Sequence, residues 1–163
     1  MFDPKRLIFI HGLEGTSQGV KARLFRNLFP EMKISDFSGS LEERMLQLYS
    51  IIGNADNWTI IGSSLGGLMA AMFAVQRPMQ ARRLVLLAPA LIWPDFAASL
   101  TAPIETPTIL YHGRRDELIP LQRVREIAHQ AFSRLEFIEV DDDHGLYQTV
   151  QKIDWREILE KGT

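Results

Sequence analysis

The sequence contains no cysteine. This absence excludes disulfide bonds, thiolate nucleophiles and cysteine-ligated zinc or iron–sulfur sites. Long hydrophobic runs are also missing near the start, where the first apolar run is Leu7–Ile10. A signal peptide needs an apolar region of about 7 to 15 residues and a membrane-spanning helix needs about 20. We therefore expect a cytoplasmic protein with no membrane insertion.

A charge excess of either sign is lacking as well. Lys and Arg number 18 and Asp and Glu number 20, for a formal net charge of −2, and no long basic run is present. Nucleic acid is therefore not expected as a partner. The sequence also lacks the G-x-G-x-x-G and P-loop patterns of nucleotide-binding α/β proteins. Its 163 residues, 46% apolar and 23% charged, are typical of one globular domain, which we expect to span residues 1–163.

Short apolar runs rich in β-branched residues indicate the strands. Most are continuous rather than alternating, as expected where helices cover both faces of a parallel sheet. The clear runs are Leu7–Ile10, Trp58–Ile61, Leu84–Leu87, Thr108–Tyr111 and Leu135–Val140, and a weaker one covers Lys33–Phe37. The run at 135–140 carries two glutamates, which indicates an edge strand.

Segments with helical spacing separate these runs. Ser40 and Glu43 form a capping-box pattern before a helix that should end at Gly53. Further helices are expected from Ser17 to Pro30, over 65–75 and behind Pro120, whereas 88–107, with four prolines, should be irregular. Strand and helix therefore alternate along the chain. This alternation predicts an α/β/α sandwich of three layers around a mostly parallel sheet of about six strands.

The segment Gly62-Ser63-Ser64-Leu65-Gly66-Gly67 carries the most chemical information. It reads G-x-S-x-G between a predicted strand and an apolar helix. A nucleophilic serine on such a sharp turn adopts a strained backbone, and Gly62 and Gly66 would relieve the crowding around Ser64. The alternative is that the glycines only allow close packing and Ser64 caps the helix.

A serine hydroxyl is a weak nucleophile and needs a base, usually histidine. His144, directly after the last predicted strand, is the best candidate, although a histidine beside acidic residues is often a solvated turn residue. His129 should be a polar helix residue. His11 and His112 precede glycines at strand ends and are expected to shape loops.

Asp116 is the candidate acid that orients this base. It follows the run at 108–111, although an acid at the start of a helix is the alternative interpretation. Ser64, Asp116 and His144 each follow a different predicted strand, and the carboxyl ends of parallel strands lie along one edge of a sheet. The three side chains can therefore converge. The neighbouring charges, Asp141–Asp143 and Arg114–Arg115, are interpreted as solvated loop charges, and the alternative is that the acids favour a protonated His144 and the arginines an ionised Asp116.

The segment His11-Gly12-Leu13-Glu14-Gly15-Thr16 follows the first strand and should lie at the same edge. Acyl transfer needs N–H donors where the oxyanion develops, and losing one such donor costs about 3 to 4 kcal/mol. Leu65, directly after the nucleophile, supplies one backbone N–H by position, and Leu13 is the candidate for the second. A flexible glycine turn is the alternative for this segment.

Together these pieces resemble the α/β-hydrolase superfamily, and within it the small bacterial serine esterases that lack a lid. The resemblance implies a serine hydrolase of carboxylic esters or thioesters, with Ser64 as nucleophile, His144 as base and Asp116 as orienting acid. The chain departs from full-length members because it begins on the strand that leads to the oxyanion loop. It also has no segment that resembles a cap domain.

The residues that would contact the substrate are less well defined by the pattern. Trp93, Phe96 and Leu118, with Ile92, are candidates for a shallow apolar rim, although aromatic residues in such a loop often seal a sheet edge instead.

We expect an acyl-enzyme mechanism on short or medium acyl chains, with a small-molecule substrate and without a metal or organic cofactor. The alternatives are a peptidase, a C–C hydrolase or a lyase with the same triad, or a non-catalytic protein-binding module. The sequence carries no indication of oligomeric state.

Overall fold

The structure is a computed structural model and describes residues 2–161. Within these residues six strands form one sheet in the order β2-β1-β3-β4-β5-β6, and all neighbouring strands are parallel. The strands are β1 (Leu7–Ile10), β2 (Lys33–Ile34), β3 (Trp58–Ser63), β4 (Ala81–Leu87), β5 (Thr108–Gly113) and β6 (Leu135–Val140). The predicted parallel sheet is confirmed, and β6 is an edge strand as expected.

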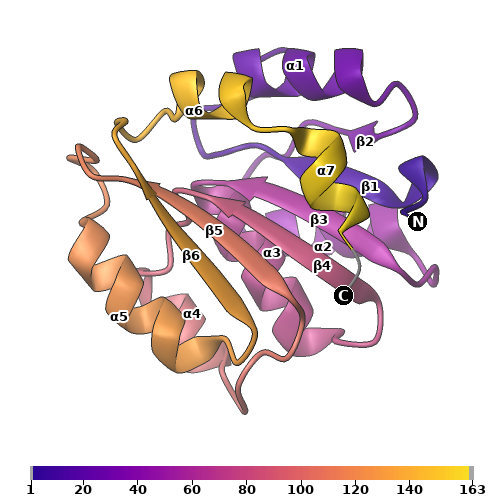
Figure 1. Ribbon diagram of the computed structural model, residues 1–163. Coiled ribbons are helices and arrows are strands. Elements are labelled where there is room, and N and C mark those ends of the chain that lie inside the picture. The colour runs from indigo at the N-terminus through magenta and orange to yellow at the C-terminus, as the bar shows by residue number, and fades with distance from the viewer. Residues whose placement is uncertain (1, 162–163) are drawn as a thin grey trace.

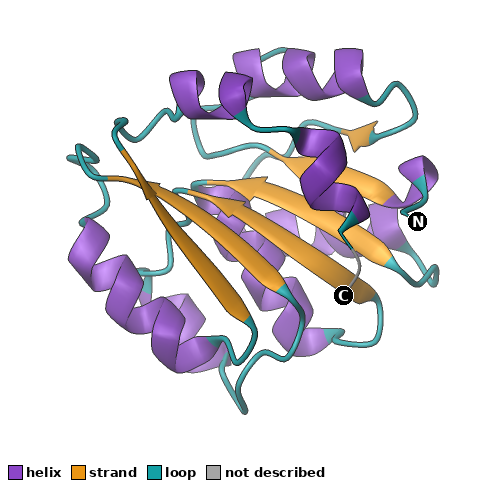
Figure 2. Ribbon diagram, viewed as in Figure 1, coloured by secondary structure: helices purple, strands orange, loops and turns teal. Residues whose placement is uncertain are grey.

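Helices cover both faces of this sheet (Figures 1 and 2). One layer holds α1 (Val20–Leu28), α6 (Tyr147–Lys152) and α7 (Trp155–Glu160), and the other holds α2 (Leu41–Ile52), α3 (Leu65–Gln76), α4 (Pro94–Ser99) and α5 (Leu121–Ala131). Alternate strand residues feed two separate cores, so that Leu7 and Phe9 pack under α1 while Ile8 and Ile10 pack under α3. The predicted three-layer sandwich is confirmed.

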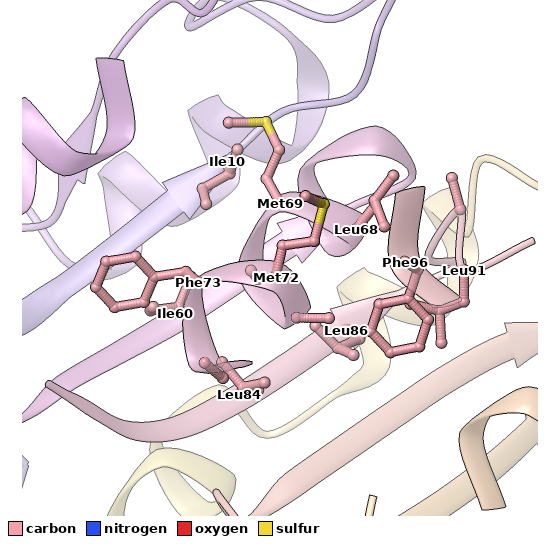
Figure 3. Packing of buried hydrophobic residues seen from close by; sticks show 14 of the residues in the cluster. Ile10, Ile60, Leu68, Met69, Met72, Phe73, Leu84, Leu86, Leu91 and Phe96 are labelled. Atoms are coloured by element: carbon pink, nitrogen blue, oxygen red, sulfur yellow. The ribbon is translucent and has the colours of Figure 1, made fainter. Parts of the chain in front are cut away.

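The central helix α3 is apolar on every side because every side is covered. Ten of its residues, from Leu65 to Ala74, are buried. Figure 3 shows its side chains against the sheet and against the segment around α4; the labelled residues are Leu68, Met69, Met72 and Phe73 of α3, Ile10, Ile60, Leu84 and Leu86 of the sheet, and Leu91 and Phe96. This burial fixes the start of α3, and with it the turn that carries Ser64.

Helix α2 confirms the capping prediction. The Ser40 hydroxyl accepts a hydrogen bond from the Glu43 N–H, the Glu43 carboxylate accepts one from the Ser40 N–H, and the helix ends before Gly53 at a positive φ of 60°. The predicted strand at 33–37 is wrong beyond residue 34, because the chain turns away and the Phe37 N–H donates to the His11 ring.

Three six-residue helices were not predicted from the sequence. Helix α4 forms inside the stretch expected to be irregular, with Pro94 as its first residue and Phe96 buried. Helices α6 and α7 follow the candidate base, and the Trp155 ring of α7 packs edge-on against the Phe25 ring of α1, 4.7 Å away. No helix within residues 2–161 combines the length and apolarity needed to cross a membrane.

Candidate active site

The loops that follow β3, β5 and β6 meet at the carboxyl edge of the sheet and bring Ser64, Asp116 and His144 together. His144 Nδ1 lies 2.7 Å from Asp116 Oδ2, so this nitrogen carries the proton and donates to the carboxylate. His144 Nε2 is then free to accept from the Ser64 hydroxyl, 3.0 Å away. A continuous relay of hydrogen bonds therefore joins the three predicted side chains.

Ser64 connects the end of β3 to the start of α3 in a strained conformation, with φ 56° and ψ −114°. Four backbone hydrogen bonds hold it there. Its N–H donates to the Leu87 carbonyl (2.9 Å), and its carbonyl accepts from the N–H groups of Gly67, Leu68 and Ala90 at 3.0 to 3.2 Å. The turn cannot relax without breaking these bonds, so the hydroxyl stays directed toward His144.

The glycines beside Ser64 allow two chain segments to touch. A Cβ at Gly62 would lie under 3.0 Å from the carbonyl of Gly66, and a Cβ at Gly66 would lie under 3.0 Å from the carbonyls of Ile10 and His11. A side chain at Gly62 would push α3 away from β3, and one at Gly66 would push it away from the end of β1. This close approach explains the G-x-S-x-G pattern and places the loop after β1 directly beside the serine.

Asp116 is fixed by its own loop. Its side chain is fully buried, and Oδ1 accepts hydrogen bonds from the N–H groups of Leu118 (2.9 Å) and Ile119 (2.8 Å). Burial alone raises the pKa of Asp116, but the hydrogen bonds from His144 and the Ile119 N–H outweigh burial and hold the pKa below its usual value. The carboxyl is therefore ionised near neutral pH and able to orient His144.

Arg114 and Arg115 form their ion pairs with carboxylates other than Asp116. Arg114 pairs with Glu139 (3.3 Å) and Arg115 pairs with Asp141 (3.0 Å), both at the exposed surface. The interpretation of these residues as loop charges agrees with this placement.

His112 packs against the loop that carries Asp116. It is fully buried, its Nε2–H donates to the Ile119 carbonyl (2.8 Å), and the same nitrogen lies 3.3 Å from Asp116 Oδ2. Burial lowers the pKa of His112, although the Ile119 carbonyl and the Asp116 charge oppose this shift. His112 is therefore neutral at pH 7 and shapes the loop that presents Asp116, as the sequence predicted.

The oxyanion candidates adjoin Ser64. His11 accepts from the Phe37 N–H through Nε2 (2.9 Å), so its Nδ1–H donates to the Gly12 carbonyl (2.7 Å) and steadies the loop. Leu65 is the first residue of α3, so its N–H has no acceptor within the helix. In the described part of the chain, the Leu13 N–H also donates to no protein acceptor. Both N–H groups are thus free, and both residues line the same cleft as Ser64.

The loop that carries His144 is tied to α6 by Asp142. This carboxylate is buried and accepts from the Thr149 N–H (3.0 Å), the Thr149 hydroxyl (2.8 Å) and the Asp143 N–H (2.8 Å). Burial raises the pKa of Asp142, but these hydrogen bonds outweigh burial and lower it overall. The interpretation of Asp142 as a solvated charge is therefore wrong, because its role is to anchor the loop of the base.

Ser64 and His144 open into a cleft of about 500 Å³. Of the three candidate substrate contacts, Trp93 and Leu118 line this cleft, and Ile92 lies beside them. The third candidate, Phe96, is wrong as a rim residue: it is fully buried and stacks on Phe132, with ring centres 6.2 Å apart. Phe96 is directed into the core because α4 forms where an irregular loop was expected, and it seals the sheet instead.

Two further residues of the cleft wall were not singled out from the sequence. Lys21 of α1 and Tyr147 of α6 come from the opposite helix layer, and the Lys21 Nζ lies 4.6 Å from the centre of the Tyr147 ring. Tyr147 follows the candidate base by three residues. Lys21 is a basic residue in the first turn of a helix with no acidic residue there, which is the one unusual feature that marks it in the sequence.

Comparisons with known proteins identify chains that this one resembles. A family model described as serine hydrolase (FSH1) matches residues 40–151, and a search of the curated proteins finds no significant match. A protein from Xanthomonas campestris pv. campestris assigned to the alpha/beta hydrolase superfamily is 25% identical, with a TM-score of 0.76 over 96% of this chain and 97% of that one.

Two more distant structures share the fold. Est1E from Butyrivibrio proteoclasticus is 16% identical with a TM-score of 0.75, covering 94% of this chain and 86% of that one. A monoacylglycerol lipase from Paleococcus ferrophilus is 18% identical with a TM-score of 0.70, covering 98% and 95%.

Proposed function

The chain belongs to the serine hydrolase (FSH1) family and has the fold of a minimal α/β hydrolase, and we propose that it cleaves small carboxylic esters or thioesters through an acyl-enzyme on Ser64. The proposed catalytic domain spans residues 1–163, without a cap domain. The observation that carries the proposal is the unbroken relay from Ser64 through His144 to Asp116 at the floor of an open cleft.

Acylation begins with the Ser64 oxygen attacking the carbonyl carbon of the substrate while His144 Nε2 takes the hydroxyl proton. The ionised Asp116 stabilises the imidazolium that forms, because it accepts from Nδ1–H. The oxyanion of the tetrahedral intermediate lies between the free N–H groups of Leu13 and Leu65. His144 then gives its proton to the leaving oxygen or sulfur, the bond to the leaving group breaks, and the acyl group remains on Ser64.

Deacylation repeats these steps with water as the nucleophile. His144 takes a proton from water as the hydroxide adds to the acyl carbon, and the same two N–H groups hold the second oxyanion. Collapse of this intermediate returns the proton to the Ser64 oxygen and releases the carboxylic acid. The balance is one ester or thioester and one water converted to one acid and one alcohol or thiol.

The shape of the cleft favours short or medium acyl chains. Its apolar wall is formed by side chains that are still partly exposed, with Ile92 and Trp93 each 36% exposed and Leu118 72% exposed. Such a wall can cover a few methylene groups but does not enclose a long chain. The free oxyanion donors and the ordered relay favour catalysis over a non-catalytic binding module, which would need neither.

A fluorophosphonate probe tests the nucleophile. We expect the wild-type protein to be labelled and Ser64→Ala to remain unlabelled, whereas Ser50→Ala, at an exposed position of α2, serves as the matched control and is labelled normally. Labelling that persists in Ser64→Ala would place the nucleophile elsewhere.

The substrate class is tested with 4-nitrophenyl acetate and butyrate beside thioesters of the same acyl groups. Hydrolysis that depends on Ser64 supports the proposal. A folded wild-type protein that turns over neither series contradicts it and favours the peptidase, C–C hydrolase, lyase or binding-module alternatives.

A further inference from the structure

Lys21 is a cationic residue in the wall of the catalytic cleft that the reaction described above does not use. It lines the cleft together with Ser64 and Gly12. It also lines a smaller pocket of about 80 Å³, bounded by the first turn of α1, the loop after β1 and Tyr147. Residues Gly12 and Ser63 line both spaces, so the smaller pocket adjoins the catalytic cleft beside the nucleophile.

Lys21 pairs with no carboxylate in the described part of the chain. Within residues 2–161 its ammonium forms no salt bridge and instead lies over the Tyr147 ring. Asp142 and Asp143 attract it through space, but Asp142 is engaged by Thr149 and the Asp143 N–H, and Asp143 accepts from the Gly145 N–H (3.0 Å).

The charge of Lys21 is not favoured by its own helix. It is the second residue of α1, where the helix dipole is positive, and neither a side-chain cap from Gly19 nor an acidic residue in the first turn offsets that charge. Burial lowers the pKa of Lys21, although the charges of Asp142 and Asp143 oppose this shift. Helix formation and burial thus both disfavour a cation here, whereas an anion bound in the cleft would favour it.

The two walls of the cleft differ in chemical character. Ile92 and Trp93 directly precede α4, Leu118 precedes α5, and all three are apolar, while Lys21 belongs to α1 and Tyr147 to α6. Glu14, which also lines the cleft, lies on the exposed loop after β1 and forms no salt bridge with Lys21. A substrate that contacts both walls would be apolar at one end and negatively charged at the other.

We propose that Lys21 is a specificity-determining residue that binds an anionic group of the substrate, so that the preferred substrate is an ester or thioester carrying a carboxylate or phosphate. This inference rests on the proposed hydrolase function. It assigns the cationic wall to the anion and the apolar wall to the hydrocarbon part of the same molecule. Lys21 does not touch the reacting bond, so its effect is on the choice of substrate.

Two matched pairs of esters test the assignment. Mono-4-nitrophenyl glutarate against 4-nitrophenyl pentanoate places the charge on the acyl group, and 3-carboxyphenyl butyrate against phenyl butyrate places it on the leaving group. The measured quantity is the ratio of kcat/KM for the anionic ester to that for its neutral partner. In at least one pair we expect this ratio to fall about tenfold in Lys21→Met, the size expected for a partly desolvated ion pair.

Matched variants separate a local contact from general charge. Lys21→Arg should keep most of the preference, because it keeps the cation. Lys33→Met removes the same charge from the exposed strand β2, outside the cleft, and should keep the wild-type ratio. Competition by acetate and by inorganic phosphate, measured on the neutral ester, shows which anion Lys21 binds better.

The outcomes distinguish this inference from the function on which it rests. If wild type and Lys21→Met give the same ratio in both pairs while hydrolysis still depends on Ser64, the role of Lys21 is overturned and the hydrolase stands. If wild type cleaves neither neutral nor anionic esters, both proposals fail. If Lys21→Met does not fold, the ratio is compared between wild type and Lys21→Arg at low and high salt, and a ratio that salt leaves unchanged overturns the assignment.

Discussion

The backbone of Ser64 predicts that replacing it by glycine or by alanine will have different effects on stability. Both substitutions delete the hydroxyl and its hydrogen bond to His144. Only glycine removes the Cβ from a residue held at φ 56° and ψ −114°. We therefore expect Ser64→Gly to be more stable than Ser64→Ala, although both are inactive.

The size of the difference follows from two opposing terms. Strain at a position of this kind costs about 1–3 kcal/mol, and Ser64→Ala keeps all of it because the four backbone hydrogen bonds of the turn prevent relaxation. Glycine loses more conformational entropy on folding, about 0.5–1 kcal/mol. Central values of about 2 kcal/mol for the strain and about 0.75 kcal/mol for the entropy leave Ser64→Gly more stable than Ser64→Ala by about 1.3 kcal/mol, or about 3–5 °C in Tm for a domain of this size.

Urea denaturation followed by circular dichroism gives both free energies of unfolding, and the two variants should share one m-value because they unfold the same surface. The matched substitution pair cancels the loss of the hydroxyl. Equal stability of the two variants, or a more stable Ser64→Ala, would refute the idea that the nucleophile turn stores strain.

Two other predictions concern the surroundings of the serine. Gly66→Ala should abolish activity and destabilise the fold, because the new methyl group meets the Ile10 carbonyl. We expect the free energy of unfolding to fall by several kcal/mol, since overpacking a site costs at least about 1–3 kcal/mol. Activity above a few per cent in a stably folded variant would contradict this prediction. His112→Asn should flatten the pH dependence of stability. Because burial lowers the pKa of His112 below the 6.5 of the unfolded chain, the unfolded chain binds the proton first and wild type loses stability as pH falls below that value. Urea denaturation at about pH 7.5 and about pH 5.5 measures the slope, and equal slopes in wild type and variant would show that His112 is not the group responsible.

Much of the site could be predicted from the sequence because its determinants are local. The strand before Ser64 is a continuous apolar run, since it is buried on both faces, and Gly62 and Gly66 mark the turn. Parallel strands bring their carboxyl ends to one edge, so the order of Ser64, Asp116 and His144 along the chain was enough to predict their meeting. The start of helix α2 could be predicted equally well, because a capping box is a contact between residues only three apart in the sequence.

The features that the sequence did not reveal depend on distant contacts. Helix α4 has only six residues, which is too few to show the helical period of apolar residues. It is stabilised by the packing of Phe96 against Phe132, a residue distant in the sequence. Helices α6 and α7 are equally short. From the sequence, Asp142 looks like one of three equivalent loop acids. In the structure it differs from the other two because Thr149, on the following helix, donates hydrogen bonds to it. From the sequence, Lys21 looks like a surface residue of α1, because nothing in the sequence indicates its contact with the Tyr147 ring.

The floor and the walls of the cleft differ in how well they tolerate substitution. Ser64, Gly66 and the loop after β1 contact one another through backbone atoms, so a change in any of them moves all of them. Ile92 and Trp93, by contrast, present side chains from a connection that runs ahead of α4. Substitutions meant to change the range of acyl chains are therefore best placed in that short connection, where side chains can be exchanged without moving the backbone around Ser64.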